Sequence, residues 1–485
     1  MPASVPIRVR WIIVAVRFTV IGHACLFIET AAGRILVDPW LSGSCYWRSW
    51  WHFPPNTPVR PEFLEPDYVY LSHHHFDHFH YPSLRRISKQ ARVFIPRFGV
   101  DVMRHELDAL GFKDIVELPH GEPAVLPGGT RVASYQYGPD DSALVVHDGD
   151  AVLVDLNDCK IKGTAARPIL KTFGRPTFVL KSHSFAQAYP NCYDIADPAD
   201  AKLMTREDFI ETFLDAVREL KPACAVPFAS MVGFLHPESR PCNAYAVRPP
   251  EVAAAAAAAP DIAAATRTVL MVPGDCWSSN GGFALQPNDY YERQDEWIER
   301  LAEKVAAKIA REEAGEQGTR LPFARFEKHF GGFLASLPPF ARLLLKRPIV
   351  FLVPSDPLPY WVLDFRRRQV RRMAAPPDTR AGIVRIREAI LADAIEKNVV
   401  AFVHISMRIR IELAPGGVQT DFLFWGLLSL RELGYFPLHR MLTRRAMGVL
   451  WRRRAEVWNA MRSLLSLRSF DQKVMGTLMS RRNAS

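Results

Sequence analysis

The sequence has 485 residues, is 48% hydrophobic and carries a formal net charge of +10. This length supports two domains with separate apolar cores, and no apolar run approaches the ~18 residues that a membrane-spanning helix requires. The segment from Leu438 to Ser485 holds eleven Arg and Lys residues against Glu456 and Asp471. The rest of the chain is nearly balanced in charge, so a strong positive field outside this basic tail is not implied.

Seven cysteines are scattered along the chain without a Cys-x-x-Cys pair, which favours a reduced, cytoplasmic protein. No Cys-x-His with a Cys-x-x-His partner occurs, so the sequence holds no Rieske iron–sulfur centre. The apolar stretch Trp11–Val16 is stopped by Arg17, and no small-residue cleavage site follows it. We expect core strands there rather than a signal peptide.

Residues from about 7 to 285 alternate short strands with helices, which predicts a layered α/β core. Helices are expected from about Pro82 and over 206–221. The alanine-rich run Glu251–Ala265 predicts a surface helix, because alanine is the best helix former. Strands are expected at 17–21, 24–30, 34–37, 66–71, 91–95, 130–136, 142–147, 151–156, 176–181, 223–227 and 268–272.

A second region begins near residue 290, with a charged helical segment over 290–314 and a loop at 315–319. Strand-like patterns at 360–365, 401–405 and 407–413 follow it. We therefore divide the chain into residues 1–288 and residues 289–485, and we expect the second part to be a smaller α+β unit without a catalytic cluster of its own.

The basic tail predicts helices, because Leu442, Ala446, Val449 and Leu450 fall at helical spacing. Its charge has three explanations: the solvated face of a docked helix, a contact with anionic membrane lipid or with a partner's acidic surface, and nucleic-acid binding. The third is disfavoured, because the tail lacks interleaved stacking aromatics and the signatures of nucleic-acid-binding folds. A cytoplasmic protein, with peripheral membrane association as an open alternative, is the resulting expectation.

The stretch Leu71–His78 contains a spaced set of imidazoles and one carboxylate, as His73-x-His75-x-Asp77-His78. The alternating run before it predicts a strand, so the set lies just past a strand end, where a rigid element aims several side chains at one point. In a tight turn His73 and His75 point to one side, and Asp77 and His78 to another, which predicts two metal half-sites. Neutral imidazole suits zinc and iron, and a carboxylate suits harder iron or manganese.

Together with Gly22-His23 and Asp38-Pro39-Trp40 upstream, this motif resembles the metallo-β-lactamase superfamily. More narrowly, the chain resembles the CMP-N-acetylneuraminate hydroxylases at Ser72–Leu84, at Leu156–Cys159, at Pro227–Ala229 with His236, and at Asp421–Trp425. The resemblance implies a four-layer αββα metallo-β-lactamase fold over residues 1–288, followed by the smaller α+β region. That hydroxylase family carries an amino-terminal Rieske domain, so an oxidative reaction here would take its electrons from an external donor.

The resemblance also implies a ligand set for two divalent metal ions, with iron favoured and zinc or manganese as alternatives. His73 and His75 would bind the first metal, and Asp77 and His78 the second. Asp158 stands where the superfamily has a bridging carboxylate, although a plain turn aspartate is the alternative interpretation.

The superfamily's next ligand is a histidine about 20 residues before the bridging acid, and this sequence has Tyr137 there. Asp140 and Asp141 lie close enough to substitute, and a carboxylate would move the site toward iron. Asp141 is named among the ligands here, and the choice between the two aspartates stays open. The Gly-Pro-Asp-Asp run is also a strong turn signal, so both interpretations stay open. Asp155 is the fallback for the bridging position.

The last histidine ligand has two candidates. His183 follows the strand at 176–181 and resembles the superfamily's usual strand-end ligand, whereas His236 matches the hydroxylase-like spacing. We rank His183 first as a metal ligand and assign His236, with Asp77 and Asp158, to the catalytic residues. Either histidine could instead be a surface-loop residue.

Four further residues are expected near the metals, in supporting or substrate-binding roles. A metal-bound imidazole needs its other nitrogen held, and Asp38 at a strand end could do this, with His23 nearby by analogy. The aromatic run Cys45–Trp51 would wall the substrate pocket, with Arg48 meeting an anion, or would form a packed corner of the core. Asp275, after the last strand, could line the same pocket or belong to a turn.

Three functions fit this site. A hydrolase would use paired metals to generate hydroxide and to cleave a lactone, phosphodiester or amide. An oxygenase would use two irons and dioxygen to hydroxylate a small or carrier-bound metabolite. A metal-binding protein without catalysis is the third. We favour the oxygenase, because the broadest resemblance is to a hydroxylase and the third imidazole is missing beside two aspartates.

Overall fold

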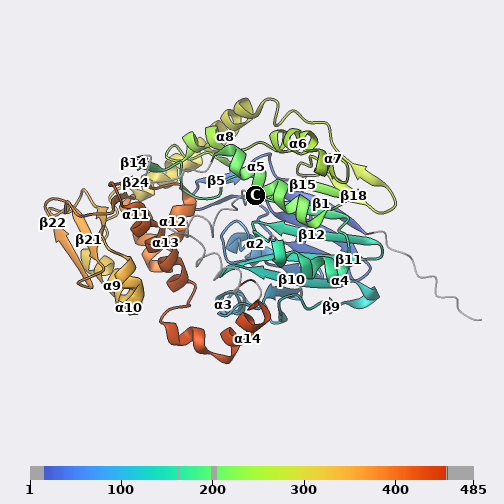
Figure 1. Cartoon of the computed structure of the whole chain (residues 1–485). Coiled ribbons are helices and arrows are strands. Elements are labelled where there is room, and N and C mark those ends of the chain that lie inside the picture. Colours follow the sequence, from blue (N-terminus) through green and yellow to red (C-terminus); the bar gives the residue numbers. More distant parts are fainter. Residues whose placement is uncertain (1–15, 162, 198–204, 455, 457–485) are drawn as a thin grey trace, which may run out of the picture.

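The computed structural model describes residues 16–161, 163–197, 205–454 and 456, and its amino-terminal part is built on two large sheets (Figure 1). The first has the strand order β19-β18-β1-β2-β3-β6-β7-β8, with bounds β1 Arg17–Gly22, β2 Cys25–Thr30, β3 Gly33–Val37, β6 Tyr68–Tyr70, β7 Arg92–Pro96, β8 Ile115–Leu118, β18 Cys276–Ser278 and β19 Gly282–Ala284. The second has the order β17-β15-β13-β12-β11-β10-β9, with bounds β9 Ala124–Val125, β10 Arg131–Tyr137, β11 Asp141–Asp148, β12 Ala151–Asn157, β13 Phe178–Lys181, β15 Cys224–Pro227 and β17 Arg267–Thr268.

The two sheets enclose an apolar core. Val20 of the first sheet belongs to the same buried cluster as Leu144 and Leu153 of the second, and the rings of Phe18 and Phe178 meet edge-on at 5.0 Å. Because side chains alternate between the faces of a strand, the other face of each sheet needs a cover of its own.

Helices provide that cover. Phe63 of α1, Leu84 of α2 and Met103 of α3 pack against the outer face of the first sheet, and Ile169 of α4 and Leu220 of α5 pack against the outer face of the second. The layers therefore run helix, sheet, sheet, helix, which confirms the predicted four-layer α/β fold. The bounds are α1 Pro61–Leu64, α2 Tyr81–Arg86, α3 Val102–Ala109, α4 Arg167–Phe173, α5 Arg206–Leu220, α6 Pro249–Ala258 and α7 Pro260–Ala263, with short 3-10 turns η1 Pro127–Gly129, η2 Gly163–Ala165 and η4 Arg240–Tyr245.

Two amino-terminal expectations change in detail. The helix predicted over Glu251–Ala265 is split into α6 and α7, because Pro260 has no backbone N–H and starts a new helix. The strand predicted over 268–272 is limited to β17, although Val269 still donates one backbone hydrogen bond to Ala225. The strands expected over Trp11–Val16 lie almost wholly outside the described residues.

The carboxyl-terminal region has its own sheet, with the order β14-β24-β23-β20-β21-β22. Its helices pack on this sheet around a core that includes Phe326, Trp361 and Phe424. The bounds are β14 Tyr193–Ile195, β20 Ile349–Leu352, β21 Tyr360–Asp364, β22 Gln369–Met373, β23 Gly382–Arg385, β24 Arg410–Leu413, α9 Phe323–Ser336, α10 Pro339–Leu344, α11 Glu388–Lys397, α12 Ala401–Ser406 and α13 Val418–Glu432.

The strand predicted over 401–405 is wrong, since α12 occupies these residues. Asn398 ends α11 in a left-handed conformation, and the chain then starts a second helix. Because the side chains from Ala401 to His404 are all buried, their pattern has no alternation, and a short apolar run of this kind fits a buried strand and a buried helix equally well.

The two regions are joined by more than the chain connection at residue 288. β14 lies in the amino-terminal part of the sequence but pairs in parallel with β24 of the carboxyl-terminal sheet. A small sheet of β4 (Ser44–Cys45), β5 (Trp50–His52) and β16 (Val232–Phe234) packs beside α8 (Gln294–Glu316). The division at residue 288 stays a prediction, and these contacts cross it.

The basic tail begins with the 3-10 turn η5 (Leu438–Leu442) and the helix α14 (Arg444–Arg452). Figure 1 shows α14 at the rim of the molecule, near α3. The guanidinium group of Arg445 donates to the backbone carbonyls of Phe98 and Val100 and pairs with Glu117. Apart from Glu456, the helices expected after 454 lie outside the described residues.

Candidate metal centre

The predicted ligands follow the carboxyl ends of parallel strands in both sheets. β3, β6 and β7 run parallel to one another, and so do β12, β13 and β15. Loops that follow such strands meet at one edge of the sheet. Asp38 follows β3, His73–His78 follow β6, Asp158 follows β12, His183 follows β13, and His23 lies in the turn between β1 and β2.

The backbone is strained at three of these strand ends. His23, Asp38 and Asn157 have φ angles of 34°, 42° and 40°, a left-handed conformation that residues with a side chain rarely adopt. Strained residues of this kind cluster at functional sites, where the surrounding structure holds them. Here the two packed sheets supply the constraint.

The possible ligand atoms of His73, His78 and Asp158 all lie within 4.8 Å of one another. The same holds within a second group, which consists of His23, Asp77 and His78. The Nε2 atom of His73 lies 2.8 Å from Nδ1 of His75, and Nε2 of His78 lies 3.5 Å from Oδ2 of Asp158. The structure thus brings the motif, Asp158 and His23 together. Because His78 belongs to both groups, the two half-sites are adjacent.

Asp38 orients His78 from behind the cluster. Its fully buried carboxylate accepts hydrogen bonds from the Ser72 backbone N–H at 2.8 Å and the Ser72 hydroxyl at 2.6 Å, and it lies 2.7 Å from Nδ1 of His78. Burial opposes a charge on His78, but Asp77 and Asp38 raise its pKa well above the ordinary value. With Nδ1 held by Asp38, the Nε2 atom of His78 faces the cluster.

Both carboxylate oxygens of Asp77 have a hydrogen-bonding partner. The hydroxyl group of Tyr46 donates to Oδ1 at 2.5 Å, and Nε2 of His23 lies 2.8 Å from Oδ2. Burial alone would raise the pKa of Asp77, but His78 and His23 hold it well below the usual range, so this carboxylate is ionised. The sequence interpretation missed Tyr46, whose only signal was the aromatic density of Cys45–Trp51.

A hairpin places an aspartate opposite Tyr137, the position where the superfamily has a histidine. β10 and β11 pair with Tyr137 opposite Asp141, so the aspartate stands across the ladder from the position where a histidine was sought. Oδ1 of Asp141 lies 3.9 Å from Nε2 of His73, and Oδ2 of Asp140 lies 3.8 Å from Nε2 of His75. Burial and the neighbouring Asp140 raise the pKa of Asp141 to about 6.

The structure favours Asp158 over Asp155 as the candidate for the bridging carboxylate. Asp158 belongs to the ligand cluster, whereas Asp155 lies fully buried within β12 and accepts the backbone N–H of Asn157. Burial and the nearby Asp38 raise the pKa of Asp155 well above its usual range, which favours the neutral acid. Both assignments stay predictions about metal binding.

The two candidates for the last histidine lie in different places. His183 lines a cavity of about 200 Å³ together with His75, Asp77 and Asp158, and burial lowers its pKa to about 3. His236 is equally buried, and its pKa is also lowered to about 3, by burial and then by Arg408.

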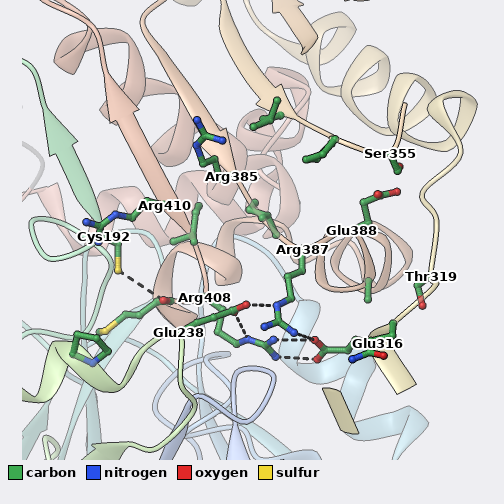
Figure 2. Close-up of a pocket in the computed structure, with 18 of the residues that line it drawn as sticks. Cys192, Glu238, Glu316, Thr319, Ser355, Arg385, Arg387, Glu388, Arg408 and Arg410 are labelled. Carbon is green, nitrogen blue, oxygen red and sulfur yellow. Dashed lines mark hydrogen bonds and ion pairs between the residues drawn. The ribbon is translucent and has the colours of Figure 1, made fainter. Parts of the chain in front are cut away.

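The surroundings of His236 are an ion-pair network rather than the ligand cluster. Its Nε2 lies 3.4 Å from Glu313, and Glu238 donates its backbone N–H to the Nδ1 atom. Figure 2 shows the neighbouring ion pairs, in which Arg408 lies between Glu238 and Glu316, at the wall of a larger cavity, whose volume is about 1030 Å³. The structure therefore does not bring His236 to the predicted metal ligands.

Arg48 and Asp275 have contacts within the protein, and their expected roles beside the substrate stay predictions. Arg48 pairs with Glu312 and, at 3.6 Å, with Glu316 of α8, so its charge is already matched. The carboxylate of Asp275 accepts the backbone N–H groups of Val272 at 2.9 Å and Gln286 at 2.7 Å. Neither residue is among those that line the cavity beside the predicted ligands.

The cavity beside the predicted ligands is lined by residues from both regions of the chain. Tyr46 and Trp50 come from the aromatic run, and Ile405 comes from α12 of the carboxyl-terminal region. The second region thus supplies part of the cavity wall. Lys181, at the end of β13, also lines the cavity, and burial lowers its pKa to about 8. Its place at a parallel strand end was the signal that sequence reasoning overlooked.

The donor set fits two divalent metal ions. Both ring nitrogens of His183, Nε2 of His78 and Nδ1 of His23 are buried without a hydrogen-bond partner among the described residues. Leaving a buried polar atom unpaired costs about 1–3 kcal/mol, so several such atoms at one edge indicate a missing partner. Imidazoles beside carboxylates are the ligands that zinc, iron and manganese accept.

Comparison with known proteins agrees with this fold. Residues 17–177 match the family model described as "Beta-lactamase superfamily domain", so this part of the chain has the metallo-β-lactamase fold. A Mycobacterium tuberculosis (strain ATCC 25618 / H37Rv) protein named "Putative Rieske 2Fe-2S iron-sulfur protein" is 35% identical over 247 residues, which are 46% of this chain and 46% of that protein. Cytidine monophosphate-N-acetylneuraminic acid hydroxylase of Danio rerio is 26% identical over 236 residues, 46% of this chain and 40% of its own. The chain thus spans less than half the length of these relatives.

Solved structures show the same kind of similarity. Igni18, a metallo hydrolase from Ignicoccus hospitalis, covers 55% of this chain and 98% of its own, with 18% identity and a TM-score of 0.39. CmlA, a diiron beta-hydroxylase from Streptomyces venezuelae, covers 44% of each chain, with 20% identity and a TM-score of 0.33. Among the described residues, no helix is long and apolar enough to cross a membrane.

Proposed function

We propose that this protein is a dioxygen-dependent oxygenase that uses two metal ions, with iron preferred, to hydroxylate a small or carrier-bound metabolite. The observation that carries the proposal is a carboxylate close to His73, near the position where the superfamily has its third histidine. Asp141 stands opposite Tyr137 in the β10–β11 hairpin and lies 3.9 Å from His73. Replacing an imidazole by a carboxylate makes a ligand set harder, and harder sets favour iron or manganese over zinc.

Sequence similarity supports an oxidative reaction. One relative is named as a hydroxylase, and another is named as a Rieske 2Fe-2S iron-sulfur protein. Hydroxylation by dioxygen consumes two electrons beyond those that the substrate gives, so the reaction needs a reductant. Because the 485 residues contain no Rieske cysteine–histidine pattern, we propose an external electron donor.

The residues of the chain would hold the metals and shape the space beside them. Two bound irons would supply the activation of dioxygen. Asp38 and Tyr46 fix His78 and Asp77 by hydrogen bonds, which sets the direction of both ligand atoms before metal binds. Lys181 offers its ammonium group to a substrate in the cavity. The proposed ligands are His73, His75 and Asp141 for one metal, Asp77, His78 and His183 for the other, and Asp158 between them.

Metal analysis of the protein tests the proposal. Purified without oxygen and reconstituted with ferrous iron, the chain should hold two irons and should consume dioxygen when a chemical reductant is added. Reconstitution with zinc should leave dioxygen consumption at background. Tight binding of zinc in place of iron, with no dioxygen uptake by the iron form, would overturn the oxygenase.

Two matched substitutions test the carboxylate ligand. Asp141→Asn should lower the metal content from two to one, because Asp141 faces the ligand cavity. Asp140→Asn should leave two metals, because Asp140 lines a separate small cavity beside α3. Unchanged metal content in both variants would rule out the substituted ligand.

A metallo-hydrolase is the second candidate, and the match to the β-lactamase superfamily domain favours it. In that reaction the metals would lower the pKa of a bound water, and the substrate would be a lactone, a phosphodiester or an amide. Turnover of such substrates by the zinc form would establish this alternative. A chain that binds metal and shows neither activity would be the non-catalytic binding protein.

A further inference from the structure

Exposed apolar side chains gather on the start of the basic tail. Among the described residues, ten large hydrophobic side chains are exposed, and half of them fall within the fourteen residues from 438 to 451. Leu442 is 74% exposed, Trp451 70% and Met447 50%, and the other two are Leu438 and Leu450. Single exposed hydrophobic residues are ordinary, whereas a contiguous group marks a surface that contacts something else.

This surface is held firmly to the molecule. On the inner face of α14, Ala446 and Val449 are buried, and Arg445 pairs with Glu117 and binds two backbone carbonyls. Met447 and Trp451 lie four residues apart and therefore share the opposite face. The exposed side chains thus belong to a docked helix that has one covered face and one uncovered face.

Arginines surround a small cavity on the same helix. It has a volume of about 160 Å³ and lies between α14 and the edge of the first sheet. Arg445 and Arg452 pair with glutamates, but Arg97 and Arg444 have no carboxylate partner within the described part of the chain. The cavity therefore carries uncompensated positive charge. Its lining is Arg97, Pro119, His120, Gln136, Arg444, Arg445, Gly448, Val449 and Arg452.

We propose that η5 and α14 form a docking surface for an anionic phospholipid bilayer. Leu442, Met447 and Trp451 enter the boundary between headgroups and acyl chains, and the cavity beside Arg97 and Arg444 receives a lipid phosphate. Helices that lie in a membrane interface combine an apolar face that contains tryptophan with arginines on the adjoining face.

The combination of apolar and basic side chains on this surface favours a bilayer over an acidic protein. A protein partner of that kind would leave the apolar side chains opposite polar groups, whereas a bilayer provides apolar and anionic groups in adjacent layers. The tail beyond this surface adds further basic residues to the same end of the sequence. This inference is independent of the reaction that the metal centre performs.

Flotation with vesicles tests the proposal on the full chain. The protein should float with phosphatidylcholine vesicles that contain about one third phosphatidylglycerol, should not float with phosphatidylcholine alone, and should be released by high salt. Arg97→Gln with Arg444→Gln should weaken binding about 25-fold, since each cation near an anionic bilayer contributes about fivefold. Met447→Ser with Trp451→Ser should weaken it by about tenfold or more.

Matched controls separate the surface from general effects. Val125 and Leu358 are exposed apolar residues outside the tail, and Arg366 and Arg367 are exposed arginines in the turn between β21 and β22. Serine at the first pair, or glutamine at the second, should leave flotation unchanged. All variants should keep the thermal unfolding temperature of the wild type.

Three results would overturn the proposal. The first is no flotation of the wild type. The second is wild-type binding by both test variants, which would place the contact in the remaining basic residues. The third is calorimetric binding of inorganic phosphate or glycerol phosphate without binding to vesicles, which would assign the arginine cavity to a soluble phosphate ester.

Discussion

Asp38→Asn should separate the stability of the fold from the affinity for metal. The carboxylate of Asp38 is fully buried, and its three hydrogen-bonding partners all belong to Ser72 and His78. The amide keeps one acceptor oxygen but places an NH2 group where the other oxygen accepted hydrogen bonds. Losing one charge-assisted hydrogen bond costs about 1.5–3 kcal/mol. The unfolding midpoint of the metal-free protein in urea should therefore fall.

The metal affinity should fall as well, because Asp38 no longer holds Nδ1 of His78. Removing such a supporting carboxylate typically costs 10–100-fold in metal affinity, about 1.4–2.7 kcal/mol. Competition with a coloured chelator, under anaerobic conditions for iron, measures this change. Asp275→Asn is the matched control, since Asp275 is buried and accepts two backbone N–H groups but does not line the ligand cavity.

We expect both variants to lose comparable stability, and only Asp38→Asn to lose metal affinity. Wild-type affinity in Asp38→Asn would refute the orienting role of this carboxylate. An equal loss of affinity in Asp275→Asn would show that the metals respond to general destabilisation of the fold.

Three further predictions follow from the buried groups. His183→Ala should remove one metal from the chain, whereas His236→Ala should leave the metal content unchanged. Elemental analysis of both purified variants shows which of the two buried histidines is a metal ligand. Arg453→Ala should weaken metal binding up to about tenfold, because Arg453 donates to the carbonyl of Gly138 at 2.7 Å, next to the aspartate pair, and chelator competition measures this loss. Burial raises the pKa of Asp421 to about 7, so the folded state binds this proton more tightly than the unfolded state does. The wild type should therefore lose stability as the pH rises from about 4 to about 7. Asp421→Asn should remove that loss, by at most about 4 kcal/mol at pH 8, and identical urea midpoints for the variant and the wild type at pH 8 would contradict it.

Much of the ligand arrangement was predictable because it is local. The run before His73 has the alternation of a strand, and the motif places four side chains within the six residues from His73 to His78, just past the end of that strand. Asp158 was found in the same way, after the strand at 151–156. In each case one short segment carries both the strand signal and the polar residue, so no knowledge of distant contacts was needed.

The wrong or incomplete predictions involve segments that are far apart in the sequence. Arg48 was expected to meet a substrate anion, but α8 brings Glu312 and Glu316 to it from more than 260 residues away. The helix at 401–406 was assigned to a strand, because burial on every side erased the pattern that distinguishes the two. Tyr46 was passed over, because its bond to Asp77 exists only when two loops meet.

The sequence by itself determined that a strand end presents two histidines, an aspartate and a third histidine, and that an imidazole is absent at Tyr137. Only the tertiary structure decided that Asp141 faces the ligands across the hairpin and that His183, rather than His236, shares their cavity. The physical reason is that secondary structure follows from neighbours along the chain, whereas a metal site is made where the ends of several strands from two packed sheets converge.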